Sequence, residues 1–377
     1  MFPVKEFTSE DEPLRALNGQ TIRGVMIVFT PMRSKRMAED DLAVSEVIGV
    51  VMLLAMVITM MGGVFVFLTP YVSDFQDNTA WTNANGIAER LDGRIDVVSG
   101  ASADTGLRTT VPSVTSSVMP IPNVEVWTIA ADLTATDSIT VKYINQTMFS
   151  IISYNESATN ATIWTQDGEQ SFSFEPSHEE VIIEHDLNVR EMYIITVRDE
   201  NNDPLHKQAK ITLSGLLIKT KVQNGEHTIA LVNDARYDKF SNEPWSIAST
   251  PNLKIEELFD GTMRASLSIR DVSIVGSIPN GRNAVFDISS AGPIGLFSGD
   301  AWNFRFSLDS ELGQTINPQM NEAWLTDYTL HRASDTLDQH RGISPWLRAS
   351  GSDGLTIDGG SNMIDLEIDL QFVEVSK

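Results

Sequence analysis

The chain has 377 residues, of which 42% are hydrophobic, and its 51 acidic and 27 basic side chains leave a formal net charge of −24. This acidity excludes a nucleic-acid binder of the usual kind, because binding the phosphate backbone needs clustered lysine and arginine. The lack of cysteine excludes disulfides, thiolate metal sites and a cysteine nucleophile.

Residues 1–31 are mixed in charge and show no clear period. Two interpretations of this segment stay open. Residues 1–43 form a cytoplasmic leader, or translation starts at Met32 and leaves the compact leader MRSKRMAEDDLA.

An uncharged apolar run of 22 residues extends from Val47 to Leu68. As a helix it would measure about 33 Å, which is enough to cross the hydrocarbon core of a bilayer. Arg33, Lys35 and Arg36 precede the run, whereas the next basic residue after it is Arg90. The positive-inside rule therefore predicts one membrane span, with a cytoplasmic N-terminus and an extracellular C-terminal ectodomain.

The helix is expected to continue past Pro70 as a stem, so that residues 44–100 form one transmembrane and stem helix. Four apolar residues at i, i+4, i+8 and i+11 predict that the stem packs against a sheet of the ectodomain, and Gly100 is expected to end it. These four residues are Ile87, Leu91, Ile95 and Val98.

From Val124 onward the hydrophobic pattern changes to the period of two that β-strands show. Strands are expected at 124–129, 139–144, 180–185, 192–197, 211–222, 228–232, 263–275, 284–288, 302–308 and 364–375. Ile364 to Val375 alternates apolar and polar residues, as a half-buried antiparallel strand does. One later helix is expected from Asn317, as its cap, to Tyr328.

These elements predict an α+β protein: a long N-terminal transmembrane helix, then a mainly antiparallel, β-sandwich-like ectodomain with one later helix. Residues 101–240 and 253–377 are expected to form two β-rich modules joined by the proline-containing stretch 241–252. One continuous sandwich is the alternative, and the sequence leaves it open.

The stretch Ala43-Val-Ser-Glu46-Val-Ile-Gly49, behind a short basic leader and before the apolar run, resembles archaeal type IV pilins and pilin-like proteins. A weaker resemblance to large pilin-like proteins of haloarchaeal type extends to about residue 115. It rests on the segment ERLDGRIDVVSG from Glu89 to Gly100.

The resemblance implies that a prepilin peptidase cuts between Ala43 and Val44. It further implies that a pilus machine assembles the subunits through their helices. Glu46 would then set the register by pairing with the new N-terminal amine of a neighbouring subunit. Leu42 departs from the family, which usually has Lys or Arg at that position. Without the resemblance, Glu46 would be an interfacial residue that marks the helix start beside a Ser45 cap.

Three N-x-S/T sequons, at Asn145, Asn155 and Asn160, are candidates for N-glycosylation of an outward-facing loop. His178 and His185 lack the spacing of a zinc helix. The oxygen-rich stretches 199–203 and 353–362 lack the ordered spacing of an EF-hand and are interpreted as turns. No catalytic residue, cofactor or metal is expected.

The leading hypothesis is therefore a non-enzymatic, pilin-like subunit of an archaeal cell-surface filament, minor or adhesive. Its partners would be the membrane, the prepilin peptidase, other pilin subunits and the assembly machinery, and not nucleic acid. The alternative is a permanently anchored, single-pass adhesin or binding protein that does not polymerise. An anchored surface hydrolase ranks third, because the sequence shows no nucleophile-plus-base constellation.

Overall fold

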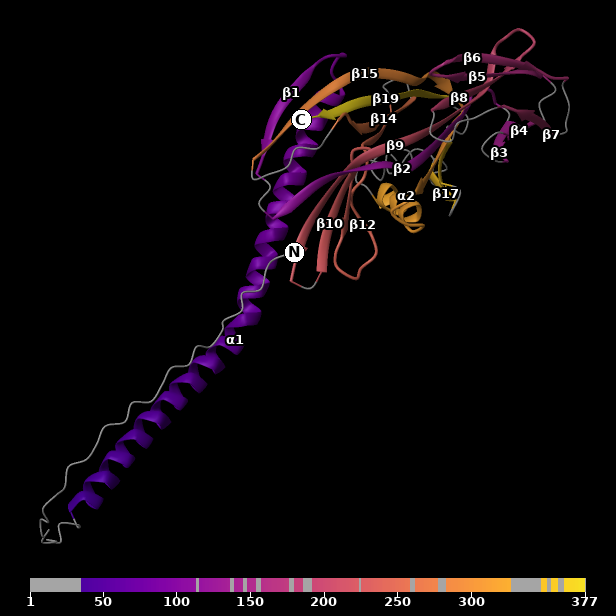
Figure 1. Ribbon diagram of the computed structural model, residues 1–377. Helices are drawn as coiled ribbons and strands as arrows, with labels where there is room; N and C mark the ends of the chain where they lie inside the picture. Colours follow the sequence, from indigo (N-terminus) through magenta and orange to yellow (C-terminus); the bar gives the residue numbers. More distant parts are fainter. Residues whose placement is uncertain are drawn as a thin grey trace, which may run out of the picture. The chain divides into compact units, whose positions relative to one another are not determined.

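The computed structural model describes residues 35–112, 115–135, 139–144, 148–153, 157–175, 180–185, 192–223, 225–257, 262–276, 283–326, 347–350, 354–358 and 363–376. The chain divides into two compact units, residues 1–69 and residues 70–377. Helix α1 (Lys35–Ser99) runs through the boundary between them, and all the described strands lie in the second unit (Figure 1). We call residues 70–99 of α1 the stem and residues 101–376 the head.

Most of the first part of α1 is a run of apolar residues with no proline before Pro70. Within the run, the Thr59 and Thr69 hydroxyls donate to carbonyls four residues earlier, each at 2.7 Å, so neither hydroxyl lacks a partner in an apolar segment. The helix continues past Pro70 and ends at Ser99, directly before Gly100, as the sequence predicts.

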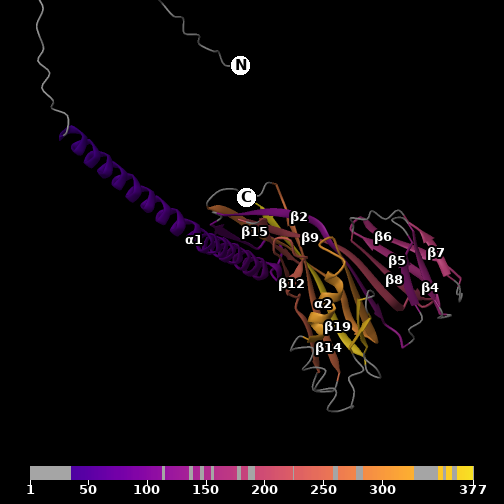
Figure 2. The same cartoon turned by 90° about the horizontal axis from the view of Figure 1, so that it is seen from below.

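The described residues of the head form three β-sheets (Figures 1 and 2). The first has the order β1 (Gly106–Val111), β15 (Ala284–Ala301), β19 (Ile364–Ser376), β14 (Met263–Ile274), β13 (Leu253–Glu257). The second has the order β12 (Ser246–Ser249), β11 (Ala235–Lys239), β10 (Gly225–Val232), β9 (Pro204–Val222), β2 (Ser116–Asp132), β16 (Asn303–Ser310), β18 (Gly354–Asp358), β17 (Leu347–Ser350).

A branch leaves the second sheet at β9, where β8 (Tyr193–Asp199) pairs with β9, β5 (Ala158–Thr165) with β8, and β6 (Gly168–Ser173) with β5. The third sheet has the order β3 (Ile139–Tyr143), β4 (Met148–Ser153), β7 (Glu180–Glu184).

The first two sheets face each other across two apolar cores. The larger core joins side chains such as Trp127 and Ile211 of the second sheet to Ile269 and Ile368 of the first. The smaller core contains residues of both sheets and the stem of α1. The hydrophobic effect therefore holds the two sheets and the stem together as one structure.

Strand β2 contributes Val118 to the smaller core and Trp127 to the larger core, and it bends at a bulge between them. Its pairing with β9 shifts between Ile121 and Glu125, where Pro122 lacks an N–H and Asn123 has a φ of 51°. Gly215 lies opposite Ile121, and a Cβ there would come within 2.3 Å of the Leu231 carbonyl oxygen. Only glycine allows this close approach of β9 to β10.

The described residues between β2 and β9, from 133 to 203, form a lobe with its own apolar core, which includes Phe149, Ile163 and Ile195. The lobe contains the third sheet and the branch strands β5, β6 and β8 (Figure 2). Asp132 and His206 pair across the point where the chain leaves and re-enters the rest of the head, with 2.6 Å between Oδ1 and Nδ1.

Each strand predicted from the sequence lies on a strand of the structure, and the mainly antiparallel pairing is confirmed. The last strand was expected to be antiparallel. Its pairing with β15 is antiparallel, as expected, whereas its pairing with β14 is parallel. Strands β1, β4, β5, β6, β11, β12, β13, β17 and β18 were not predicted.

The later helix, α2 (Ile316–Thr326), is confirmed, although it begins one residue before the predicted cap Asn317, and Tyr328 lies outside the described residues. Met320 and Trp324 of α2 are buried in the larger core, as their shared face predicts.

Strands from 101–240 and from 253–376 share both large sheets, since β1 pairs with β15 and β2 pairs with β16. The expected linker 241–252 contributes β12 to the second sheet. The division into two modules stays a prediction, and this shared pairing favours the alternative of one continuous β-structure.

Candidate functional site: the membrane helix and its stem

The first half of α1 exposes its apolar side chains. Across the predicted span their exposed fractions run from 43% at Val57 to 74% at Phe65. Among the described residues this is the one helix long and apolar enough to cross a membrane, and none of its most apolar segment is buried. So large an exposed apolar surface favours a membrane or another helix as its surroundings.

The residues predicted to act in processing and assembly all lie on α1. The backbone of Ala43 and Val44 is helical, whereas their side chains lie outside the described residues. Glu46 is exposed. Because α1 begins at Lys35, Ser45 is not the cap of this helix and Glu46 does not mark its start.

The stem differs from the first half because its apolar side chains are buried in the head. The four stripe residues Ile87, Leu91, Ile95 and Val98 are 0–3% exposed. They pack against Ile218, Ile229 and other residues of the second sheet, and against Phe286, Val373 and other residues of the first. The sequence prediction that the stem packs on a sheet is confirmed, and the stem contacts both large sheets.

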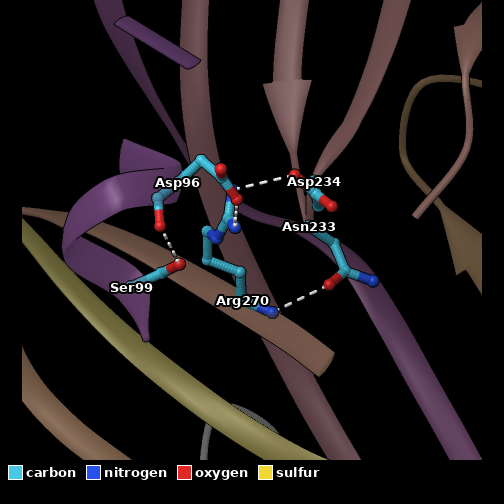
Figure 3. Close-up of polar contacts among 5 residues, drawn as sticks. All are labelled: Asp96, Ser99, Asn233, Asp234 and Arg270. Atoms are coloured by element: carbon cyan, nitrogen blue, oxygen red, sulfur yellow. Dashed lines mark hydrogen bonds and ion pairs between the residues drawn. The ribbon is translucent and has the colours of Figure 1, made fainter. Parts of the chain in front are cut away.

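A buried arginine ties the last turn of the stem to the head. Figure 3 shows Arg270, from β14, reaching Asp96 of α1 and Asp234 of the β10–β11 turn. Its Nη2 donates to Asp96 at 3.0 Å and its Nη1 to Asp234 at 2.9 Å. Its backbone N–H donates to Asn233 Oδ1 at 2.8 Å. The Arg270 side chain is only 6% exposed, so the two carboxylates compensate for part of the water that its charge loses, whereas its Nε atom is buried without a hydrogen-bond partner.

The turn that presents Asn233 and Asp234 has a backbone conformation that few residue types adopt. Both residues have positive φ, 50° and 60°, as the two central residues of a type I′ hairpin turn require. Burial raises the pKa of Asp234, and the charge of Arg270 opposes that rise. Burial, followed by the charge of Asp234, also raises the pKa of Asp92, which lies one helical turn before Asp96.

Three more polar contacts hold the stem along its length. Arg236 donates from Nη2 to Asn85 Oδ1 at 2.6 Å, and Arg90 donates to the Thr110 carbonyl at 3.0 Å. Asp77 accepts from the Gln223 backbone N–H at 2.9 Å, which attaches the start of the stem to the β9–β10 hairpin. Together with the buried stripe, these contacts hold residues 77–99 of the stem against the head.

A polar cavity of about 220 Å³ opens beside Arg270 and is also lined by Lys254 and Gln371. Sequence reasoning missed this site. Asn233-Asp234 after an apolar strand is a recognisable turn signal, but no local pattern shows that Arg270 meets it.

The remaining candidate residues are the histidines and the oxygen-rich stretches. Among the described residues, no group of three or more acidic, histidine or cysteine side chains could hold a metal ion. Asp199 Oδ1 accepts from the backbone N–H groups of Asn201 and Asp203 at 2.9 and 2.8 Å, as a turn residue does. Two candidates, His178 and part of 353–362, lie outside the described residues.

The structure describes one of the three sequon asparagines, Asn160. Asn145 and Asn155 lie outside the described residues. Asn160 lies on β5, partly exposed, with its Oδ1 buried and without a hydrogen-bond partner. Glycosylation of all three stays a prediction.

The structure thus defines the class of protein coarsely: a β-rich head that carries an apolar helix long enough to cross a membrane. Residues 43–147 match DUF7289, a family of unknown function. No curated protein and no solved structure matches the chain.

Proposed function

We propose that this protein is a pilin-like subunit of an archaeal type IV pilus-type surface filament, minor or adhesive, assembled through the first half of α1. One observation carries the proposal. The AVSEVIG motif lies at the N-terminal end of an exposed apolar helix segment. The same helix continues as the stem, whose apolar side chains are buried against the head. The DUF7289 match starts at residue 43, the residue before the expected cut, but brings no function with it.

The chemistry of this segment suits assembly after cleavage. A cut between Ala43 and Val44 would create an ammonium group two residues from the exposed Glu46 carboxylate. In a bundle of apolar helices, that ammonium group would pair with Glu46 of a neighbour, because an unpaired buried charge costs several kcal/mol, roughly 3–5 when a partner is removed. The pair would favour one axial register.

The glycines of the exposed segment would allow neighbouring helices to approach closely. A Cβ added at Gly49, Gly62 or Gly63 would meet no atom within 4 Å in this chain. Small residues of this kind are common where membrane helices pack against each other. Head-to-tail contacts between such helices would extend a filament wherever the rotation between neighbours does not close into a ring.

A permanently anchored adhesin is the second candidate, and one observation favours it. Helix α1 continues without a break from Lys35 through the expected cut, and Leu42 occupies the position where the pilin family usually has Lys or Arg. A protease needs a locally unwound backbone, so an intact helix at this point would preserve the leader.

The N-terminal sequence of the protein isolated from its native membrane separates these functions. A chain that starts at Val44 supports prepilin-type processing, and a chain that retains Arg33–Arg36 contradicts it. Filament assembly is then measured for Glu46→Gln in a processed background, with Ser45→Ala as the matched control. We expect Glu46→Gln alone to reduce the yield of sedimenting filaments, and equal yields would refute the role in register.

A further inference from the structure

A pocket of about 330 Å³ lies between the ends of two neighbouring hairpins of the second sheet. One wall comes from the β9–β10 hairpin and the other from the loop 240–245 that joins β11 to β12. The volume falls at the lower end of the range for small-molecule sites, roughly 300–1,000 Å³.

The floor of the pocket is a row of three side chains across three strands. Thr228 of β10 lies opposite Lys219 of β9 on one side and opposite Lys239 of β11 on the other. Residues that lie directly opposite each other in antiparallel strands point to the same face of a sheet. Two lysines therefore stand on either side of a threonine hydroxyl.

Trp245 provides the apolar wall. Its backbone carbonyl accepts from Gln319 Nε2 of α2 at 3.5 Å, and Gln319 Oε1 accepts from the Ile247 backbone N–H at 3.3 Å. The Nζ atom of Lys239 lies 5.7 Å from the centre of the Trp245 ring. The ammonium group thus lies over the indole, which itself packs against the larger core, before any ligand binds.

The two hairpin ends approach each other closely at Gly225. This residue has a φ of 136°, and a Cβ there would come within 2.4 Å of Ser241 Oγ. Ser241 Oγ donates to the Glu226 carbonyl at 3.1 Å. Asn242, with a φ of 67°, turns the chain beside it. This contact places a hydroxyl and an amide at the rim of the pocket.

The charges in the pocket are not balanced. Lys219 pairs with Glu226 at 3.1 Å. Lys239 forms no ion pair with any residue that the structure describes, and its ammonium group lies over the Trp245 ring. In a protein with a net charge of −24, this pocket therefore presents one uncompensated positive charge beside an aromatic ring.

We propose that this pocket binds a hexuronate, a pyranose sugar that carries a carboxylate. The apolar face of the sugar ring would contact Trp245, and the carboxylate would accept hydrogen bonds from Lys239. Ser241 and Asn242 provide the donors and acceptors that sugar hydroxyls need. The inference goes beyond the proposed function, because such a pocket would act equally in a filament subunit and in a permanent anchor.

The test uses the full chain in nanodiscs of uncharged phosphatidylcholine, titrated calorimetrically with methyl β-glucuronide and with methyl β-glucoside. These two probes differ only at C6, which is a carboxylate in the glucuronide and a hydroxymethyl group in the glucoside. We expect the glucuronide to bind about tenfold more tightly, as the gain of one charge-assisted hydrogen bond in an open pocket implies. Lys239→Gln should remove this difference, and Trp245→Leu should abolish binding of both sugars.

The matched control is Lys142→Gln, an exposed lysine on β3 outside the pocket, which should change neither affinity. The proposal is overturned if neither sugar binds, if both bind equally to the unaltered chain, or if Lys142→Gln has the same effect as Lys239→Gln. Sodium sulfate that displaces the glucuronide at equal concentration would also overturn it, because the pocket would then bind anions without recognising a sugar. Lys239→Gln changes a partly exposed side chain, so the test holds even if Trp245→Leu does not fold.

Discussion

Replacing Arg270 by methionine tests whether the polar contacts of the stem stabilise the head. Methionine keeps most of the aliphatic volume but removes the charge and the hydrogen bonds to Asp96 and Asp234. Asp96 is 67% exposed and regains water, whereas Asp234 is 27% exposed and is left partly desolvated without its partner.

The expected cost follows from these exposures. Removing one partner of a fully buried ion pair costs about 3–5 kcal/mol, whereas an exposed pair contributes about 0–1 kcal/mol. Arg270 is buried but both carboxylates retain some water, so we expect the free energy of unfolding to fall by about 2–3 kcal/mol.

Guanidinium titration of the full chain in detergent micelles at pH 7, followed by tryptophan fluorescence, measures this change. Arg264→Met is the matched control, because Arg264 lies on the same strand and pairs with Asp365 at 2.8 Å but is 46% exposed. We expect the control to cost less than about 1 kcal/mol. The double variant with Asp234→Asn should lose less than the sum of the two single variants, since the two residues share one interaction.

Equal destabilisation by Arg270→Met and Arg264→Met would refute the reasoning, because burial would then make no difference to the value of the ion pair. Strict additivity of Arg270→Met and Asp234→Asn would refute the direct coupling. A large change in the slope of the titration would indicate altered cooperativity instead of altered stability.

Three further outcomes are expected. Leu91→Ala removes a fully buried stem side chain and should lower the midpoint of the same titration by the equivalent of about 2–5 kcal/mol. Burial raises the pKa of Glu125 to about 7, and its hydrogen bond from Trp127 offsets only part of the rise. The folded protein then binds more protons than the unfolded chain between about pH 4.5 and 7. As the pH rises through that window, Glu125 therefore lowers the free energy of unfolding by about 3 kcal/mol. Glu125→Gln should remove this decline in a pH series of thermal melts. Burial raises the pKa of Asp132, but the hydrogen bond and charge of His206 more than compensate and lower it overall. This contribution is present above about pH 4 and lost below it, and Asp132→Asn should cost about 1.5–3 kcal/mol at pH 7 in urea titration, as the loss of a hydrogen bond to a charged group does.

The prediction of the last strand succeeded because that strand has one more buried and one more exposed face. Ile364 to Leu370 of β19 alternates in this way and was identified from its period of two. The short or nearly exposed strands β6 and β12 were missed, since their side chains bury too little to carry the alternation. The parallel pairing of β14 with β19 was also missed, because strand direction depends on the connection between strands and leaves no local pattern.

The candidate site divides in the same way. Residues 43–68 and the stem stripe are readable from the sequence, because membrane insertion and helix burial depend on local composition and on a period of 3.6 residues. The contact of Arg270 with Asp96 joins residues 174 positions apart. Likewise, the hexuronate pocket needs Lys239 and Trp245 to meet a strand that ends at Val222.

By itself, therefore, the sequence determined that the chain has one apolar helix, an amphipathic stem and a β-rich remainder. Only the tertiary structure decided which strands share a sheet, that the stem is buried between both sheets, and where unpaired charges gather. The reason is physical: propensity and periodicity act over a few residues, whereas the partners of a buried charge are set by how distant segments pack.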